Sequence, residues 1–235
     1  MPLSEPQIER YSRQIILPEI GGRGQERLLQ SRVALVGAGA MGYSAALYLA
    51  AAGVGEIDWY AAEEASSSSR LPQLRDEVTD LNPDVSVRIA GLDAGARSTE
   101  FARIGADLLL STTTNPVILA AVNAVAVEHN LSLVVGYVRG MLGWTGAFVG
   151  QEEGYPCLRC WEVPWKITEH FAEEPATAGV IAPMAVLIAL KMLLGLGGHR
   201  WGTVLQYDGE TSRMTDHPVA KRPDCSACAL SGTGS

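Results

Sequence analysis

The sequence is short of cationic side chains, and it lacks an apolar segment at its start. Lysine and arginine number 18 against 26 aspartates and glutamates, so the formal net charge is -8. This balance argues against a nucleic-acid binder, which usually presents a basic face, and against electrostatic docking on anionic lipid. Residues Met1 to Arg13 are polar and charged, so no signal peptide is expected. No internal repeat is visible.

Long apolar runs are also scarce. The longest one, Ala178 to Gly198, contains Pro183 and Lys191, and its pattern favours a buried helix over a membrane span. Cysteine is limited to four residues, all in CxxC pairs, which favours metal binding over disulfides and predicts a cytoplasmic protein. Hydrophobic residues still make up 47% of the 235 residues, enough for the sizeable core of one large α/β domain.

Strand and helix patterns alternate along the first two thirds of the chain. Strands are expected at 33–36, 57–60, 85–90, 108–111 and 133–138, and helices at 5–17, 25–30, 43–52, 71–81, 99–104 and 117–129. Residues 21–24 are expected to form a turn, 66–69 a flexible loop, and 140–149 added antiparallel structure. Such alternation predicts a Rossmann-like α/β fold with a mostly parallel sheet flanked by helices.

We expect one domain over residues 1–235, organised in three parts. Residues 1–30 form an N-terminal helical arm, and residues 31–138 form a Rossmann-like core of the nucleotide-binding type. Residues 139–235 form the antiparallel extension, a crossover segment and a cysteine-bearing tail, which begins as a loop at Pro218.

The four cysteines predict a structural zinc site. Cys157 and Cys160 form one CxxC pair, and Cys225 and Cys228 form the other. Two such turns complete the tetrahedral four-thiolate shell that zinc prefers, with no position left open for water. The site would then pin the tail to the body of the domain. Two disulfides, four free thiols and an iron–sulfur cluster are the alternatives.

A glycine-rich turn, Gly37-Ala-Gly39-Ala-Met-Gly42, follows the first predicted strand and opens a helix. In this context Gly37 allows the tight turn, Gly39 lets the backbone approach a phosphate, and Gly42 lets helix and strand pack closely. However, the next strand ends in Ala61 and Ala62, without the acid that grips a ribose in working sites. The turn is therefore either a nucleotide site or a vestigial one.

Several stretches together resemble the ThiF/MoeB (HesA) family, relatives of the ubiquitin-activating enzymes, and the match spans nearly the whole chain. These stretches are Arg10-Tyr-Ser-Arg13-Gln-Ile-Ile-Leu-Pro18, the glycine-rich turn, Leu47 to Gly55, Leu81-Asn-Pro-Asp-Val85, Cys157-Leu-Arg-Cys160, Ala178 to Pro183, and Arg222 to Cys228. The resemblance implies dimers that bind ATP and magnesium and adenylylate the C-terminal carboxylate of a small ubiquitin-like sulfur carrier or a peptide. It also implies that the cysteine pairs bind zinc.

The chain departs from this family where the family holds ATP and magnesium. The acid implied for the ribose falls at Ala61 or Ala62, and the stretch whose asparagine and arginine reach the phosphates is reduced to 65–70. The family's lysine is replaced near Gln73. Thr114, in Thr112-Thr-Thr114-Asn115, takes the place of the magnesium aspartate. The cysteine of the crossover segment aligns near Pro175, which leaves none for a thioester.

Other candidate residues are ambiguous in sequence. Arg13 lies in the stretch that, in family dimers, reaches the partner's ATP, so it could act in trans; with Arg10 it could instead be a solvated helix charge. Arg139 could meet a carboxylate or form a plain salt bridge. His170, beside Glu169, could be a base or a solvated loop residue. The tryptophans near the cysteines could line a groove for a partner's tail or belong to the core: Trp144, Trp161, Trp165 and Trp201.

Three hypotheses follow. In the first, which the lost groups favour, the chain is a catalytically degenerate zinc-binding partner or scaffold, paired with itself or an active homologue and presenting a carrier protein or peptide. In the second, it is a divergent ATP-dependent adenylyltransferase with relocated carboxylates at Glu63, Glu64 or Asp208. In the third, the glycine-rich turn binds another small anion. Binding of ATP and magnesium, and the choice between homodimer and heterodimer, stay open at this stage.

Overall fold

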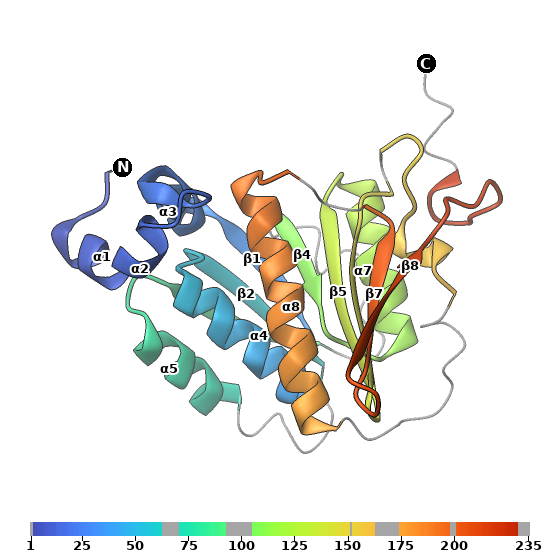
Figure 1. Cartoon of the computed structure of the whole chain (residues 1–235), viewed down its shortest axis with the longest axis horizontal. Helices are drawn as coiled ribbons and strands as arrows, with labels where there is room; N and C mark the ends of the chain where they lie inside the picture. The colour runs from blue at the N-terminus through green and yellow to red at the C-terminus, as the bar shows by residue number, and fades with distance from the viewer. Residues whose placement is uncertain are drawn as a thin grey trace.

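One eight-stranded sheet organises the part of the chain that the computed structural model describes, which is residues 2–62, 71–92, 105–150, 152–162, 174–197 and 201–229. The strand order is β3-β2-β1-β4-β5-β6-β7-β8 (Figure 1). The first five strands run parallel: β1 Arg32–Val36, β2 Glu56–Ala62, β3 Ser86–Leu92, β4 Leu108–Ser111 and β5 Ser132–Arg139. The last three run antiparallel: β6 Leu142–Phe148, β7 Thr203–Asp208 and β8 Arg213–Pro218. The predicted fold class is confirmed.

Helices cover both faces of the sheet. One face carries α4 (Gly39–Ala52), α5 (Leu71–Leu81) and α8 (Pro175–Leu194), and the other carries α7 (Pro116–Glu128) (Figure 1). Two hydrophobic clusters follow this division, one under α4 and α8 and one under α7. All residues of β4, Leu-Leu-Leu-Ser, are buried. A strand that is covered on both faces needs such a continuous apolar run, and this is why β4 lies near the middle of the sheet.

The long apolar segment forms α8, the one helix in the described ranges whose length and composition would also suit a membrane span. It ends at Gly195, which adopts a left-handed conformation (φ 67°) as a C-cap. One side of α8 packs on the sheet through alanines and β-branched residues, among them Ile181, Ala182 and Ala185. This buried face identifies α8 as a core helix of the domain. The outer side keeps Leu187 59% exposed.

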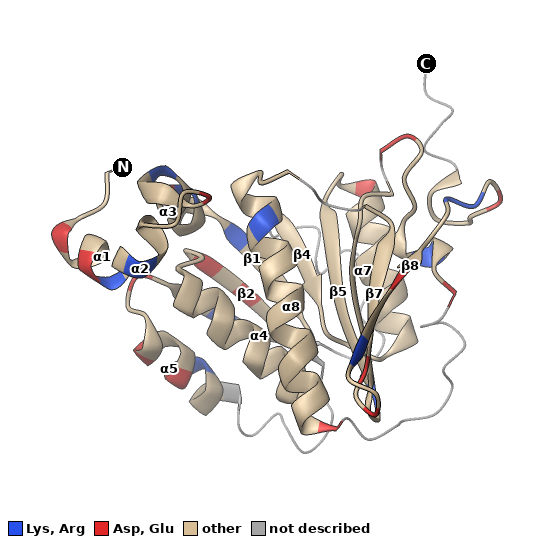
Figure 2. Cartoon of the chain, in the orientation of Figure 1, with Lys and Arg blue, Asp and Glu red and all other residues tan. Residues whose placement is uncertain are grey.

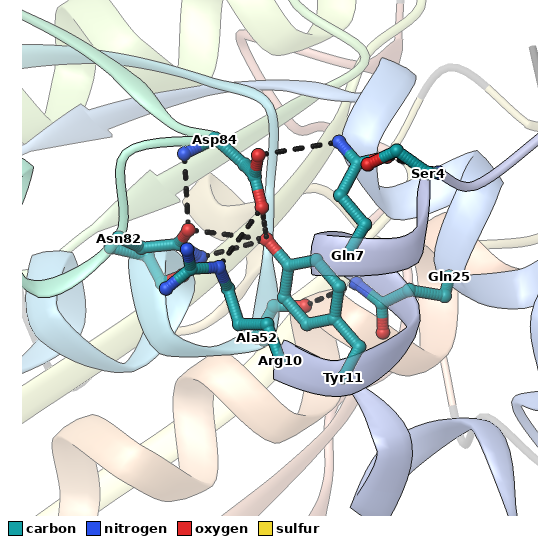
Figure 3. A network of polar contacts seen from close by, with 9 residues as sticks. Ser4, Gln7, Arg10, Tyr11, Gln25, Ala52, Asn82 and Asp84 are labelled. Carbon is teal, nitrogen blue, oxygen red and sulfur yellow. Dashed lines mark hydrogen bonds and ion pairs between the residues drawn. The ribbon is translucent and has the colours of Figure 1, made fainter.

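The N-terminal arm differs from the expected single helix over 5–17. It breaks at Tyr11 (φ -96°, ψ 11°) into α1 (Glu5–Arg10) and α2 (Ser12–Ile15). The Tyr11 hydroxyl is buried between the Asn82 side chain, at 2.9 Å, and the Asp84 carboxylate, at 3.1 Å (Figure 3). Asn82 also donates to the carbonyl of Ala50, near the end of α4. The break turns Tyr11 inward and fastens the arm to the C-terminal end of α4.

Two other boundaries need correction. The turn expected at 21–24 is the first turn of α3 (Gly21–Gln30), because only Gly21 takes a left-handed conformation (φ 59°) and the chain is helical from there. Strands β7 and β8 were not expected. All residues of β8 are exposed, and only Val204 of β7 is fully buried, so neither strand carries an alternating apolar signal. The expected helix over 99–104 and the loop over 66–69 lie outside the described residues.

The turn after β1 lies unusually close to the turn after β4. Gly37 has φ 139°, and a Cβ placed on it would lie 2.9 Å from the backbone of both Thr112 and Thr113. A Cβ on Gly42 would lie 2.8 Å from the carbonyl oxygen of Gly37. Glycine is needed at these two positions so that β1, α4 and the β4–α7 turn can meet.

We predict that Gly37→Ala destabilises the fold far more than Gly39→Ala. Both positions have positive φ, but a Cβ on Gly39 would meet nothing within 4 Å. Alanine at 39 should therefore cost about 1 kcal/mol of backbone strain, and alanine at 37 roughly 3 kcal/mol or more because a steric clash adds to the strain. Urea unfolding of the two variants measures the difference, and equal losses of unfolding free energy would contradict this account of the turn.

Candidate nucleotide site and metal centre

The carboxyl ends of the parallel strands form one edge of the sheet, and the glycine-rich turn lies at its centre. The chain leaves β1 toward α4 on one face and leaves the neighbouring strand β4 toward α7 on the other face (Figure 1). Open α/β sheets bind ligands at such a switch point, outside the ends of the strands. Residues 37–42 and 112–115 therefore lie side by side at this switch point, which is called the switch-point crevice after the place where such sheets bind ligands.

The glycine-rich turn is built so that an anion can approach it. The Trp59 indole N–H donates to the Gly37 carbonyl at 2.7 Å, inside the core, and this bond fixes the turn. Helix α4 then begins with Ala38 as its N-cap, which has no side chain to satisfy the first N–H groups. Gly39 is exposed, and the space beside its Cα is open. A phosphate fits this arrangement through backbone N–H groups and the helix dipole. The role of Gly37, Gly39 and Gly42 in binding a cofactor stays a prediction.

The turn after β4 faces the glycine-rich turn. It offers hydroxyl groups at the place where the resemblance to the ThiF/MoeB family implies a carboxylate. Ser111 and Thr112 are buried, and their hydroxyl oxygens have no hydrogen-bond partner among the described residues. Asn115 caps α7 by accepting hydrogen bonds from the N–H groups of Val117 and Ile118. Thr114 is half-buried. None of the residues 111–115 is acidic, so this turn offers no carboxylate to bind magnesium.

The ribose side of the crevice also lacks an acid where β2 ends. Ala61 is buried and its methyl group offers no hydrogen bond. Tyr60 stands before it, and burial, together with the nearby Asp58 carboxylate, raises the pKa of its hydroxyl to about 12. Glu63 and Glu64, which the sequence offers as relocated acids, lie outside the described residues, as does His170.

Two charged residues flank this edge. Arg139 ends β5 and is exposed. Asp208 ends β7. It pairs with Leu142 of β6, which in turn pairs with Arg139, so Asp208 lies near the end of β5. Its carboxylate already accepts hydrogen bonds from the Thr211 hydroxyl at 2.8 Å and from the N–H of Glu210 at 2.9 Å. The Thr211 hydroxyl and the N–H groups of Thr211 and Glu210 lower the pKa of Asp208. Its oxygens stabilise the β7–β8 turn, which weakens its case as a relocated catalytic acid.

Arg13 does not lie at this crevice within its own chain. It is exposed on α2, and the arm is fastened at the C-terminal end of α4, whereas the glycine-rich turn lies at the N-terminal end. A helix of 14 residues separates the two places, a length of about 21 Å at 1.5 Å per residue. Arg13 therefore lies far from the glycine-rich turn of its own chain.

All four cysteines meet in one buried cluster. Cys157 and Cys160 flank and belong to the short 3-10 helix η2 (Leu158–Cys160), and Cys225 and Cys228 follow β8. The four sulfur atoms lie within 4.8 Å of one another, with Cys157–Cys225 at 3.7 Å and Cys160–Cys228 at 3.6 Å. A tetrahedron with metal–sulfur bonds of about 2.3 Å has edges of about 3.8 Å, whereas a disulfide needs about 2.05 Å. The geometry fits a four-thiolate metal site.

Burial and nearby N–H groups shift the pKa values of three of the four thiols. Burial raises the pKa of the Cys157 thiol above its ordinary range and, despite the N–H of Arg222, raises that of Cys160 to about 11. Burial acts the same way on Cys225, but the N–H groups of Ala227 and Cys228 outweigh it and lower its pKa to about 7. Burial therefore disfavours the thiolate forms of Cys157 and Cys160, and a bound cation would hold these two as thiolates.

The tryptophans divide between core and surface. Trp144 packs against Tyr137, and Trp161 stacks on Phe148 with ring centroids 6.3 Å apart. Both are buried, as the core interpretation requires. Trp201 is half-buried, and Trp165 lies outside the described residues.

Sequence reasoning missed the Arg222 N–H, which donates to Cys160 Sγ at 3.5 Å. The only sequence signal for this contact was the position of Arg222, three residues before Cys225.

Known proteins resemble this chain over almost its full length. The ThiF family profile matches residues 11–68 and 60–227. A molybdopterin-synthase adenylyltransferase of Escherichia coli is 32% identical over 253 aligned positions, covering 96% of this chain and 98% of that protein. A SAMP-activating enzyme E1 of Haloferax volcanii is 31% identical, covering 100% and 94%. Among solved structures, E. coli MccB with MccA superimposes with a TM-score of 0.78 at 18% identity, covering 97% of this chain and 75% of that one.

The structural likeness establishes a shared fold. The switch-point turn and the cysteine pairs agree with the family profile and the sequence identity. The chain belongs to the ThiF family.

Proposed function

We propose that the chain is a divergent ATP-dependent adenylyltransferase that activates the C-terminal carboxylate of a small ubiquitin-like carrier protein or a peptide. The observation that carries this proposal is the end-to-end similarity to adenylyltransferases at about a third identity. This outcome favours the second of the three sequence-based hypotheses over the first. Similarity to a sulfur carrier protein ThiS adenylyltransferase of Escherichia coli, 28% identical over 93% of this chain, supports a carrier protein as the partner class.

The residues fit part of the ATP molecule. Adenylyl transfer depends mainly on positioning and charge neutralisation, so the protein must hold the phosphates and aim the carboxylate. In this proposal the open space at Gly39 and the uncapped start of α4 would receive the phosphates, and Arg139 at the end of β5 would meet a carboxylate. Thr114 and Ala61 stand where the resemblance implies acids for magnesium and for the ribose. These residues do not fit the metal, so no step is assigned to it.

That same absence supports a second candidate, a degenerate partner subunit. A chain without these acids could still hold the fold and supply Arg13 in trans to the ATP of an active homologue. Loss of a single stabilising group costs roughly 100- to 1000-fold in rate, so several losses would leave little activity at this chain's own site.

Pyrophosphate exchange separates the two candidates. We expect the purified chain, given ATP, magnesium and a carrier with a free C-terminus, to exchange labelled pyrophosphate into ATP. Gly39→Asp should reduce the exchange at least about 100-fold, because it places a carboxylate where the phosphates approach. Gly22→Asp, at an equally open position on α3, serves as the matched control and should retain it.

Exchange that appears only when an active homologue is added would favour the partner-subunit function, provided that Arg13→Ala removes it. Absence of exchange in both conditions would overturn both candidates.

We propose that the metal is zinc and that its role is structural. The sulfur–sulfur distances near 3.7 Å match a zinc tetrahedron, and four cysteines fill all its positions. The bound ion would join η2 to the segment after β8, so that the C-terminal part of the chain is held against the sheet.

Elemental analysis of the purified protein should give one zinc per chain. Cys225→Ser should lower this ratio and make the segment after β8 sensitive to protease, whereas Ser226→Ala, at the exposed position next to it, should change neither. Iron with visible absorbance, or no metal at all, would contradict the zinc proposal.

We also propose that the chain is cytoplasmic and works as a dimer. Helices α4 and α8 pack side by side, and their outer faces leave Tyr48 52% and Leu187 59% exposed. On the arm, Ile16 is 77% exposed. A second copy, or a homologue, would cover these apolar side chains, and a dimer also offers the only route by which Arg13 can reach a glycine-rich turn.

Sedimentation should show a dimer that Leu187→Glu converts to monomers, because a buried, unpaired carboxylate in the interface is costly. Leu81→Glu is the control, since Leu81 is 46% exposed on α5 and lies outside the proposed interface. A monomeric wild-type chain would exclude the homodimer and leave only the pairing with a homologue.

A further inference from the structure

A groove beside the cysteine cluster lies apart from the switch-point crevice. It has a volume of about 640 Å³ and runs between the loop before η2 and the loop after β8. Its lining comes from Gly154, Tyr155, Pro156, Trp201, Val219, Ala220, Lys221, Arg222, Pro223 and Ala229. None of the roles proposed above uses this groove.

The charge of the groove is opposite to that of the chain. Among the described residues its lining contains Lys221 and Arg222 and no carboxylate, although the protein as a whole carries -8. These cations follow β8, on the loop at the right of Figure 2 where blue ribbon marks Lys and Arg. A pocket with cations only, in an acidic protein, selects an anionic ligand. The same net charge argues against nucleic acid as that ligand.

Both cations retain donors for a ligand. The Lys221 ammonium donates one hydrogen bond, of 3.3 Å, to the Glu152 carbonyl, and an ammonium has three donors. Arg222 makes one long contact of 3.4 Å with exposed Glu162, and its Nε–H is buried without a hydrogen-bond partner among the described residues.

The rest of the lining suits a peptide chain. Tyr155 is 39% exposed and Trp201 half-buried, and each offers a flat, partly apolar ring. Pro156 and Pro223 add rigid apolar surface. Aromatic and proline side chains beside cations are suited to an extended segment that alternates apolar and acidic residues.

Close contacts join the segments that line the groove. Gly202, just before β7, has φ 68°, and a Cβ there would lie 2.5 Å from the Pro156 ring and 3.0 Å from the Val219 carbonyl oxygen. The Val219 N–H donates to the Gly202 carbonyl at 2.6 Å, and the Arg222 N–H donates to the Cys160 sulfur at 3.5 Å. Contacts that hold a binding surface in place reduce the conformational entropy lost on binding.

We propose that this groove binds an extended acidic segment of a partner protein. The bound segment would lay its backbone along Tyr155 and Trp201 and place carboxylates on Lys221 and Arg222. This docking surface lies outside the switch-point crevice, so it stands whether or not the chain catalyses adenylyl transfer.

Fluorescence anisotropy with the full chain tests the proposal. The probes are labelled twelve-residue peptides with glutamate or aspartate at alternate positions and leucine or proline between them. We expect saturable binding that weakens as salt rises from about 0.05 to 0.5 M, because screening shortens the range of the charge–charge attraction. The same peptides with lysine in place of the acidic residues should not bind.

Variants assign the binding to the groove. Lys221→Glu and Tyr155→Ala should each weaken it about tenfold or more, a change of roughly 1.4 kcal/mol. Arg23→Glu makes the same charge change at an exposed position on α3 and should leave the affinity within twofold. No saturable binding of any acidic peptide, or equal losses in Lys221→Glu and Arg23→Glu, would overturn the proposal. Circular dichroism of the variants excludes unfolding as the cause.

Discussion

The close approach of Gly37 to the turn after β4 is the constraint on which the functional edge depends. With a Cβ at Gly37, the backbones of Thr112 and Thr113 would have to move, and β1 and β4 could not keep their parallel register while their helices leave on opposite faces. The Trp59 indole then fixes the turn from below through the Gly37 carbonyl. The close approach of these two turns is therefore a steric requirement of the fold itself.

The cysteine cluster solves a different problem at the other side of the sheet. Strand β8 is exposed along its whole length and buries little apolar surface, so hydrophobic packing alone does not hold the chain beyond it. The four cysteine sulfur atoms lie within 4.8 Å of one another just after this strand, where a bound metal ion would supply a fixed point. The loop after β8 lines the groove directly before it enters the cluster, so the same ion would also hold this side of the groove in place.

Sequence reasoning succeeded where one signal decided the structure. The buried runs, such as Leu108–Ser111, gave the parallel strands, and the CxxC spacing gave the cysteine cluster. It failed where long-range contacts decided. The break at Tyr11 depends on Asn82 and Asp84, which are more than seventy residues away, so the local sequence pattern does not predict it. The groove was foreseen only as a possible role of tryptophans, because its cations become neighbours of Trp201 only in the folded chain.

The three glycines of the turn do not carry equal weight as evidence of nucleotide binding. Gly37 and Gly42 are required by the fold itself, because a Cβ on either would meet backbone within 3 Å, so a chain that had lost ATP would still need them. Gly39 differs, since nothing lies within 4 Å of its Cβ position. Its positive φ of 69° tolerates asparagine or aspartate as well. An exposed glycine in open space beside an uncapped helix start would let a phosphate come close to the backbone. Gly39 is therefore the glycine on which the proposed nucleotide role depends most.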